Sequence, residues 1–154
     1  PYQHLFAPLG MHSALMETDA CGNFVGSSYM LGSAADWAKL GLLYAQDGIW
    51  KGKRILPEGW VKYSTTPAAS APQREYGAHF WLNLGTAGRP ETRKMPDVPG
   101  EVFYASGFGG QRIFIVPSQD LVIVRLGAAH FREPDFNALL SQLLADFSSN
   151  RIKF

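Results

Sequence analysis

Cysteine, long apolar runs and charge of one sign are all scarce in this sequence. The only cysteine among the 154 residues is Cys21, which excludes an internal disulfide framework and a cysteine-based zinc site and leaves the redox compartment open. No apolar run approaches the roughly 18 residues that a membrane-spanning helix needs. The 14 Lys and Arg nearly balance 13 Asp and Glu, so a net charge of +1 offers no electrostatic footprint for a nucleic-acid backbone.

The residues that are present are typical of a globular domain. Hydrophobic residues make up 46% of the chain and charged residues 18%, which excludes a disordered tail or an acidic linker. A chain of 154 residues has the length of one ordinary domain with a core. It begins at Pro1 instead of a methionine, and we expect it to belong to something longer.

Two segments have the start signals and the periodicity of helices. Ser33 and Asp36 form a Ser-x-x-Asp start, because the hydroxyl caps free backbone N–H groups and the carboxylate lies where the helix dipole favours it. The apolar residues that follow share one face: Trp37, Leu40, Gly41 and Tyr44. Asp47-Gly48 supplies the stop. After Pro134, the spacing of Leu and Phe predicts a second amphipathic helix over 136–147, which needs a sheet to cover.

Strands are expected in the second half of the chain. Residues 76–84 are aromatic and apolar, which favours a strand, and 85–100 form a long irregular loop. Three short segments predict an antiparallel meander: 101–106, 111–116 and 121–126. The other expected elements are a helix end within 2–16, a polar turn at 51–54 and the first turn of a short helix at 57–60.

Histidines and isolated carboxylates give no sign of a metal site. The four histidines, His4, His12, His79 and His130, lack helical pairing and neighbouring acidic ligands, so we interpret them as surface or partly buried polar residues. Asp36 is most simply the helix-start carboxylate, and Asp120 the turn residue before a strand. We predict neither a metal nor a cofactor.

The strongest local signal is the run YASGFGGQ at 104–111. Three glycines within four positions, after a strand that ends in a small hydroxyl residue, let a ligand or another backbone come close. Exposed backbone N–H groups there could hold an oxyanion. On these residues alone, a plain glycine-rich hairpin is the first interpretation. The chain contains no Ser-x-x-Lys, no Gly-x-Ser-x-Gly and no Cys/His pairing, so the nucleophile signature of a hydrolase is absent from it.

Four segments, taken together, carry a resemblance over essentially the whole chain. They are LFAPLGM at 5–11, SAADWAKLG at 33–41 with Asp47-Gly48 behind it, YGAHFW at 76–81, and ASGFGGQ at 105–111 running into Val116-Pro117 and LVIV at 121–124. In order and spacing they resemble the C-terminal half of the serine β-lactamase and penicillin-binding-protein family, in particular its class C, esterase and 6-aminohexanoate-dimer-hydrolase branch.

This resemblance implies an α+β fold, namely the C-terminal part of a β-lactamase/transpeptidase-like fold. We expect an antiparallel sheet with a C-terminal helix packed on it, together with helices of the helical subdomain. Residues 1–75 would belong to the helical region and 76–154 to the α/β region. The N-terminal part of the same protein, with the nucleophile, would be absent from this chain.

The resemblance also implies acyl-enzyme chemistry. In the family a serine of a Ser-x-x-Lys motif is acylated, a lysine and a Tyr-x-Asn tyrosine move protons, and backbone amides stabilise the oxyanion. The third family motif, Lys/His-Ser/Thr-Gly, falls on Ala105-Ser106-Gly107. Ser106 would present its hydroxyl to the substrate, Gly107 would let the substrate lie against the strand, and the backbone N–H of Phe108 would be one of two oxyanion donors.

Two departures from the family pattern limit the expected activity. Ala105 replaces the lysine of many β-lactamases, which removes a fixed positive charge and favours an ester, amide or small-peptide substrate over a β-lactam. The Ser-x-x-Lys and Tyr-x-Asn segments are missing, so we expect the intact protein to be a serine hydrolase and this chain alone to be inactive. The alternative is a non-catalytic peptide- or cell-wall-binding module that keeps the fold without the nucleophile.

The sequence and the resemblance also lead to expectations about partners. We expect a small-molecule ester, amide or peptide substrate, no nucleic acid and no membrane span. Without the N-terminal strands of the family, a strand edge and a sheet face would be exposed, so residues 1–154 alone should be poorly soluble or self-associate. The family is often exported, but the compartment of this protein remains open.

Overall fold

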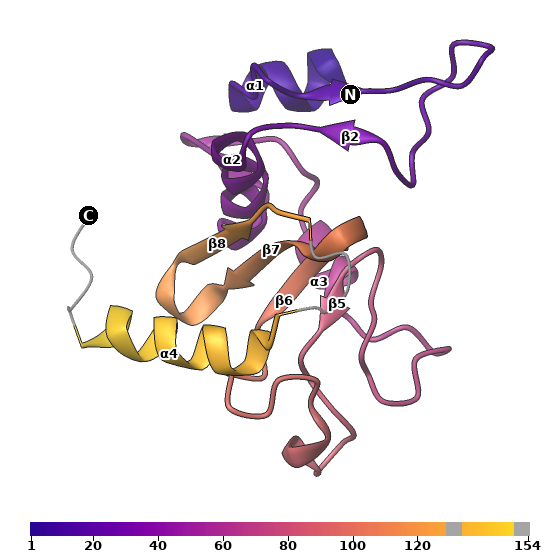
Figure 1. Cartoon of the computed structure of the whole chain (residues 1–154). Helices are drawn as coiled ribbons and strands as arrows, with labels where there is room; N and C mark the ends of the chain where they lie inside the picture. The colour runs from indigo at the N-terminus through magenta and orange to yellow at the C-terminus, as the bar shows by residue number, and fades with distance from the viewer. Residues whose placement is uncertain (129–133, 150–154) are drawn as a thin grey trace.

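A four-stranded antiparallel sheet lies at the centre of the computed structural model, which describes residues 1–128 and 134–149 (Figure 1). The strand order is β5-β6-β7-β8, and helices α2 and α4 lie on opposite faces of the sheet. The sheet strands are β5 Trp81–Leu82, β6 Phe103–Gly107, β7 Gln111–Val116 and β8 Leu121–Arg125. The helices are α1 Ala7–Leu9, α2 Ala34–Ala45, α3 Trp60–Ser64 and α4 Phe136–Ser148, with a π-turn at Tyr2–Phe6 and 3₁₀ turns at Pro90–Thr92, Phe108–Gly110 and Pro117–Gln119.

Helix α4 covers one face of the sheet, as its periodicity predicts. The Asp135 side chain caps the helix by accepting a hydrogen bond from the Ala138 N–H at 3.0 Å. Leu140 and Leu144 are buried against a cluster that includes Phe114 of β7. The expected amphipathic helix and its docking on a sheet are therefore confirmed.

Helix α2 covers the opposite face of the sheet. It begins after Ser33, whose hydroxyl accepts from the Asp36 N–H at 3.2 Å, as the start signal predicts. Gly41 allows close contact, because a Cβ built there would lie 2.5 Å from Val122 Cγ1 of β8. The apolar face of this helix thus reaches the sheet where a larger residue would force the two apart.

The meander of three strands forms with the expected turns, whereas the first strand is much shorter than predicted. Instead of a strand over 76–84, only Trp81–Leu82 joins the sheet as β5. The preceding residues fold back in a tight turn in which the Gly77 N–H donates to the Phe80 carbonyl at 2.8 Å. A Cβ on Gly77 would lie 2.2 Å from the Ser64 carbonyl oxygen, so this turn packs tightly against the end of α3.

The predictions for two short segments, 57–60 and 51–54, are corrected as well. The short helix α3 starts at Trp60, after Gly59 in the left-handed region at φ 77°, so 57–59 form the turn before it and not its first turn. The polar segment 51–54 turns only at Lys51-Gly52, while Lys53–Arg54 form strand β4 paired with β3 Ile49–Trp50. Both residues of that turn have positive φ, which is what a two-residue hairpin needs.

The N-terminal segment packs beside α2. Its π-turn and α1 end at Gly10, which is left-handed at φ 67°, and this agrees with the expected helix end and turn. Leu9 and Met11 are buried with Leu43 of α2. Strand β1 Leu15–Met16 pairs with β2 Met30–Leu31 in a separate ribbon. Within residues 1–128 and 134–149, no helix is long and apolar enough to cross a membrane.

Candidate functional site

The candidate site is the second half of strand β6 and the glycine turn that follows it. On one side β6 pairs with β7 along its whole length, from Phe103↔Ile115 to Gly107↔Gln111. On the other side it pairs with β5 only at Phe103 and Tyr104. In the part of the chain that the structure describes, Ala105 to Gly107 therefore have an open strand edge.

The main-chain direction along β6 follows from its hydrogen bonds. The Asn83 N–H donates to the Val102 carbonyl at 3.1 Å, so Val102 turns its main-chain groups toward the β5 side. Because these groups alternate along an antiparallel strand, Tyr104 and Ser106 turn theirs to the same side. Ser106 lies beyond the end of β5, and its N–H and C=O are directed to the open edge.

The alternation continues through the start of the glycine turn. Gly107 is extended, at φ −115° and ψ 168°, and its carbonyl is on the β7 side. The chain contains no cis peptide bond in its described part, so the Phe108 N–H points away from the Gly107 carbonyl, toward the open edge. The Phe108 ring is 95% exposed, so the backbone of this residue, and not its ring, is what the fold holds in place.

The side chains of β6 divide between the two faces of the sheet. Ala105 packs on the α2 face with the cluster of Phe103 and Ile113. Ser106 is exposed and lies opposite Arg112 in the register, on the α4 face. The structure thus places the four predicted residues, 105–108, at one open strand edge, where Ser106, Gly107 and Phe108 are exposed.

Three side chains to which sequence reasoning assigned no role hold this turn. Arg112 Nη1 donates to the carbonyls of Gln111 at 2.8 Å and Gly107 at 3.3 Å. Arg125 Nη1 donates to the Gly110 carbonyl at 2.7 Å, and the Gln111 side chain accepts from the Gly127 N–H at 2.9 Å. The sequence does contain a sign of this role, since Arg112 and Arg125 stand in otherwise apolar strands. A charged side chain at such a position needs polar partners.

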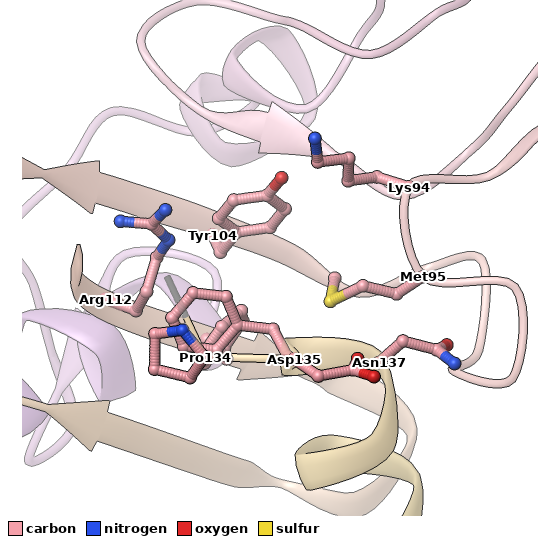
Figure 2. Close-up of a pocket in the computed structure, with 9 residues that line it drawn as sticks. Lys94, Met95, Tyr104, Arg112, Pro134, Asp135 and Asn137 are labelled. Carbon is pink, nitrogen blue, oxygen red and sulfur yellow. The ribbon is translucent and has the colours of Figure 1, made fainter. Parts of the chain in front are cut away.

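Two cavities lie near the sheet but do not include residues 105–108. The first, of about 240 Å³, is on the α4 face, where Figure 2 shows Tyr104 and Arg112 beside each other with Lys94 reaching toward them. The second, of about 480 Å³, lies between α2, α3 and the start of β6. The candidate site is therefore an open strand edge that neither of these two cavities includes.

The most perturbed carboxylate of the described chain is structural. Asp36 is buried and accepts from Lys39 Nζ at 2.6 Å and from the Ser13 hydroxyl at 2.6 Å. These hydrogen bonds lower the pKa of Asp36 from 3.8 to about 2. The cluster joins the N-terminal segment to α2, which agrees with a helix-start role.

Histidines do not assemble a metal site in the described residues. No group of three or more His, Cys, Asp or Glu side chains in residues 1–128 and 134–149 could hold a metal ion. His79 lies in the turn before β5 with φ 67°. His130 lies outside the described residues.

Comparison with known proteins gives a fold and no closer relationship. No protein-family model matches the chain, and no curated protein matches it. Solved structures match over nearly all of it: a Bacillus anthracis protein assigned as a 6-aminohexanoate-dimer hydrolase has a TM-score of 0.71 at 20% identity over 96% of this chain. A Bacteroides dorei protein assigned as a β-lactamase has 0.63 at 15% over 94%, and a Mycobacterium bovis β-lactamase has 0.63 at 18% over 97%.

The chain spans only part of each of these structures. It covers 37% of the Bacillus anthracis protein, 49% of the Bacteroides dorei protein and 55% of the Mycobacterium bovis protein. At such low identity the match establishes the fold alone. The chain has part of a β-lactamase-like α+β fold, as the sequence predicts.

Proposed function

We propose that this chain is the C-terminal portion of a serine hydrolase that acts through an acyl-enzyme. The observation that carries the proposal is the open edge of β6, where the Ser106 main chain and the Phe108 N–H face the same side. Hydrolases of ester and amide bonds need such preorganised N–H donors where negative charge develops. The structural neighbours assigned as a 6-aminohexanoate-dimer hydrolase and β-lactamases support the same class.

In this proposal the residues of the edge have separate roles. The Phe108 N–H is one of two oxyanion donors, and the Ser106 hydroxyl contacts the substrate. Gly107 lets the substrate lie against the strand, because no side chain blocks the approach. The acylated serine and its base come from the N-terminal part of the same protein, since no Ser-x-x-Lys occurs among these residues.

The proposed substrate is an ester, an amide or a small peptide. Ala105 supplies no positive charge for a substrate carboxylate, so the edge is better suited to a neutral acyl group than to a β-lactam. Residues 1–75 belong in this scheme to the helical region and 76–154 to the α/β region. The N-terminal part would also pair with the outer edge of β8, which has no strand partner within the described residues.

Serine-directed labelling tests this proposal. The full-length protein should react covalently with a fluorophosphonate and hydrolyse an activated ester, because both reactions need an activated serine beside an oxyanion site. Residues 1–154 alone should do neither. If the full-length protein carries a Ser-x-x-Lys and still fails to label or to turn over an ester, the proposal is wrong.

A second candidate is a non-catalytic module that binds a peptide or a cell-wall fragment along the same edge. Ala105 favours this candidate, because it lacks the positive charge that many β-lactamases carry at this position. An open strand edge can also accept an extended peptide through main-chain hydrogen bonds. Saturable peptide binding by full-length protein that neither labels nor hydrolyses esters would favour this candidate over the enzyme.

A further inference from the structure

The peptide group between Gly107 and Phe108 is held from behind by a charged side chain. Its N–H is the proposed oxyanion donor, and its carbonyl accepts a hydrogen bond from Arg112 Nη1 at 3.3 Å. The two ends of a trans peptide point in opposite directions, so a donor on the carbonyl fixes the direction of the N–H. A cationic donor also polarises the amide, which strengthens the N–H as a hydrogen-bond donor.

Arg112 is itself firmly placed. It is buried, with 7% of its surface exposed, and its guanidinium carbon lies 4.8 Å from the centre of the Phe136 ring of α4. It donates a second hydrogen bond to the Gln111 carbonyl at 2.8 Å. The C-terminal helix therefore supports the arginine that supports the turn.

The sheet register makes this arrangement unusual. Arg112 lies directly opposite Arg125 of β8, and two like charges at such a position oppose each other. Each arginine instead donates to a carbonyl of the glycine turn, Arg112 at Gly107 and Arg125 at Gly110. Only the Gly107 carbonyl belongs to the peptide that carries the Phe108 N–H, so the two arginines have different consequences for the site.

We infer that Arg112 is a positioning residue for the reaction, which orients and polarises the Gly107–Phe108 peptide so that its N–H stabilises the oxyanion. The inference rests on the proposed function. Arg112 thereby stabilises the transition state although it lies on the β7 side, away from the open edge. Arg125 stabilises only the turn.

Paired ester substrates measure this effect in the full-length protein. A thiono ester places sulfur where the oxyanion forms, and sulfur accepts hydrogen bonds poorly, so the ratio of oxo-ester to thiono-ester kcat/KM reports on the donors. We expect Arg112→Gln to lower kcat and this ratio about 10-fold, short of the roughly 100- to 1,000-fold cost of removing a donor outright. Arg112→Lys, which keeps the charge and the buried stem, should lose less.

Arg125→Gln is the matched control, because it removes a hydrogen bond to the same turn at Gly110. It should lower the melting temperature and leave the ratio near the wild-type value. Selective isotopic labelling of the glycine carbonyl carbon and the phenylalanine nitrogen adds a direct readout, since Gly107-Phe108 is the single Gly-Phe pair in this chain. The Phe108 nitrogen resonance should move upfield in both Arg112 variants.

The outcomes separate the inference from the function on which it rests. An unchanged ratio in folded Arg112 variants, or an equal fall in Arg125→Gln, overturns the positioning role and leaves the hydrolase intact. A wild-type protein that hydrolyses neither ester overturns the proposed function, and this inference with it.

Discussion

The two halves of strand β6 share one neighbouring strand but differ in their second neighbour and in burial. Both pair with β7, but Phe103 and Tyr104 also pair with β5 and are buried, whereas Ser106 and Gly107 have an open edge and are exposed. The first half belongs to the hydrophobic core. The second half offers main-chain hydrogen-bonding groups that no other strand of the described chain uses.

The difference arises from the segment before β5 and not from β6. Continued pairing would place Phe80 opposite Ala105, but the chain turns over residues 77–80 and buries the Phe80 ring against Phe103, with ring centres 5.3 Å apart. A site can thus be made by ending a neighbouring strand early. Substitutions in the paired half should therefore lower stability, and substitutions in the open half should lower activity.

The largest expected effect is on stability, from the paired half. Phe103→Ala removes a ring that is 4% exposed and should destabilise the full-length protein by about 3–5 kcal/mol, through lost burial and the cavity left behind. Denaturant unfolding measures it, and kcat per folded molecule should stay near the wild-type value. Phe108→Ala, which removes a 95% exposed ring, is the control and should change stability by less than about 0.5 kcal/mol. Equal losses in the two variants would contradict the division of β6.

The largest expected effect on activity comes from the open half. Phe108→Pro removes the backbone N–H together with the exposed ring, and Gly107 is already extended, as a residue before proline should be. Ester kcat should fall about 100- to 1,000-fold, while the melting temperature changes little. Phe108→Ala keeps the N–H and should retain wild-type kcat. Normal turnover by the proline variant would remove Phe108 from the oxyanion site.

A smaller change is expected at the neighbouring hydroxyl. Ser106→Ala removes one uncharged hydrogen bond to substrate, so kcat/KM should fall about 3- to 10-fold. Stability should stay within about 0.5 kcal/mol because the side chain is exposed. Steady-state kinetics and thermal unfolding of the same preparation measure both. A loss in stability with unchanged kinetics would place Ser106 with the core half.

The smallest effect on activity is expected at a contact remote from both halves. Asp36 has a pKa of about 2, below its ordinary 3.8, because Lys39 and Ser13 donate hydrogen bonds to the carboxylate. A depressed pKa stabilises the fold above about pH 4 and loses that contribution as pH falls toward 2. Asp36→Asn should melt several degrees lower at neutral pH and lose less between pH 4 and 2, with unchanged kcat. A parallel acid profile in the two proteins would refute this.

Local chemistry explains why so much of the fold is predictable. Ser33 and Asp135 are helix caps that act on residues within three positions of themselves. The meander follows from apolar segments separated by turns of three and four residues. Residues 76–84 do not form one long strand. The close approach of Gly77 to the Ser64 carbonyl and the burial of the Phe80 ring outweigh the β propensity of the segment.

The site divides in the same way. By itself, the sequence determined most of the α+β elements and the glycine turn after β6, because caps, periodicity and turn residues act over a few positions. Only the family resemblance pointed to Ala105–Phe108 as site residues, and their roles stay predictions. Only the tertiary structure decided where β5 stops and that Arg112 reaches the Gly107 carbonyl. Those features depend on residues brought together from distant parts of the chain, and on which backbone groups their neighbours leave unpaired.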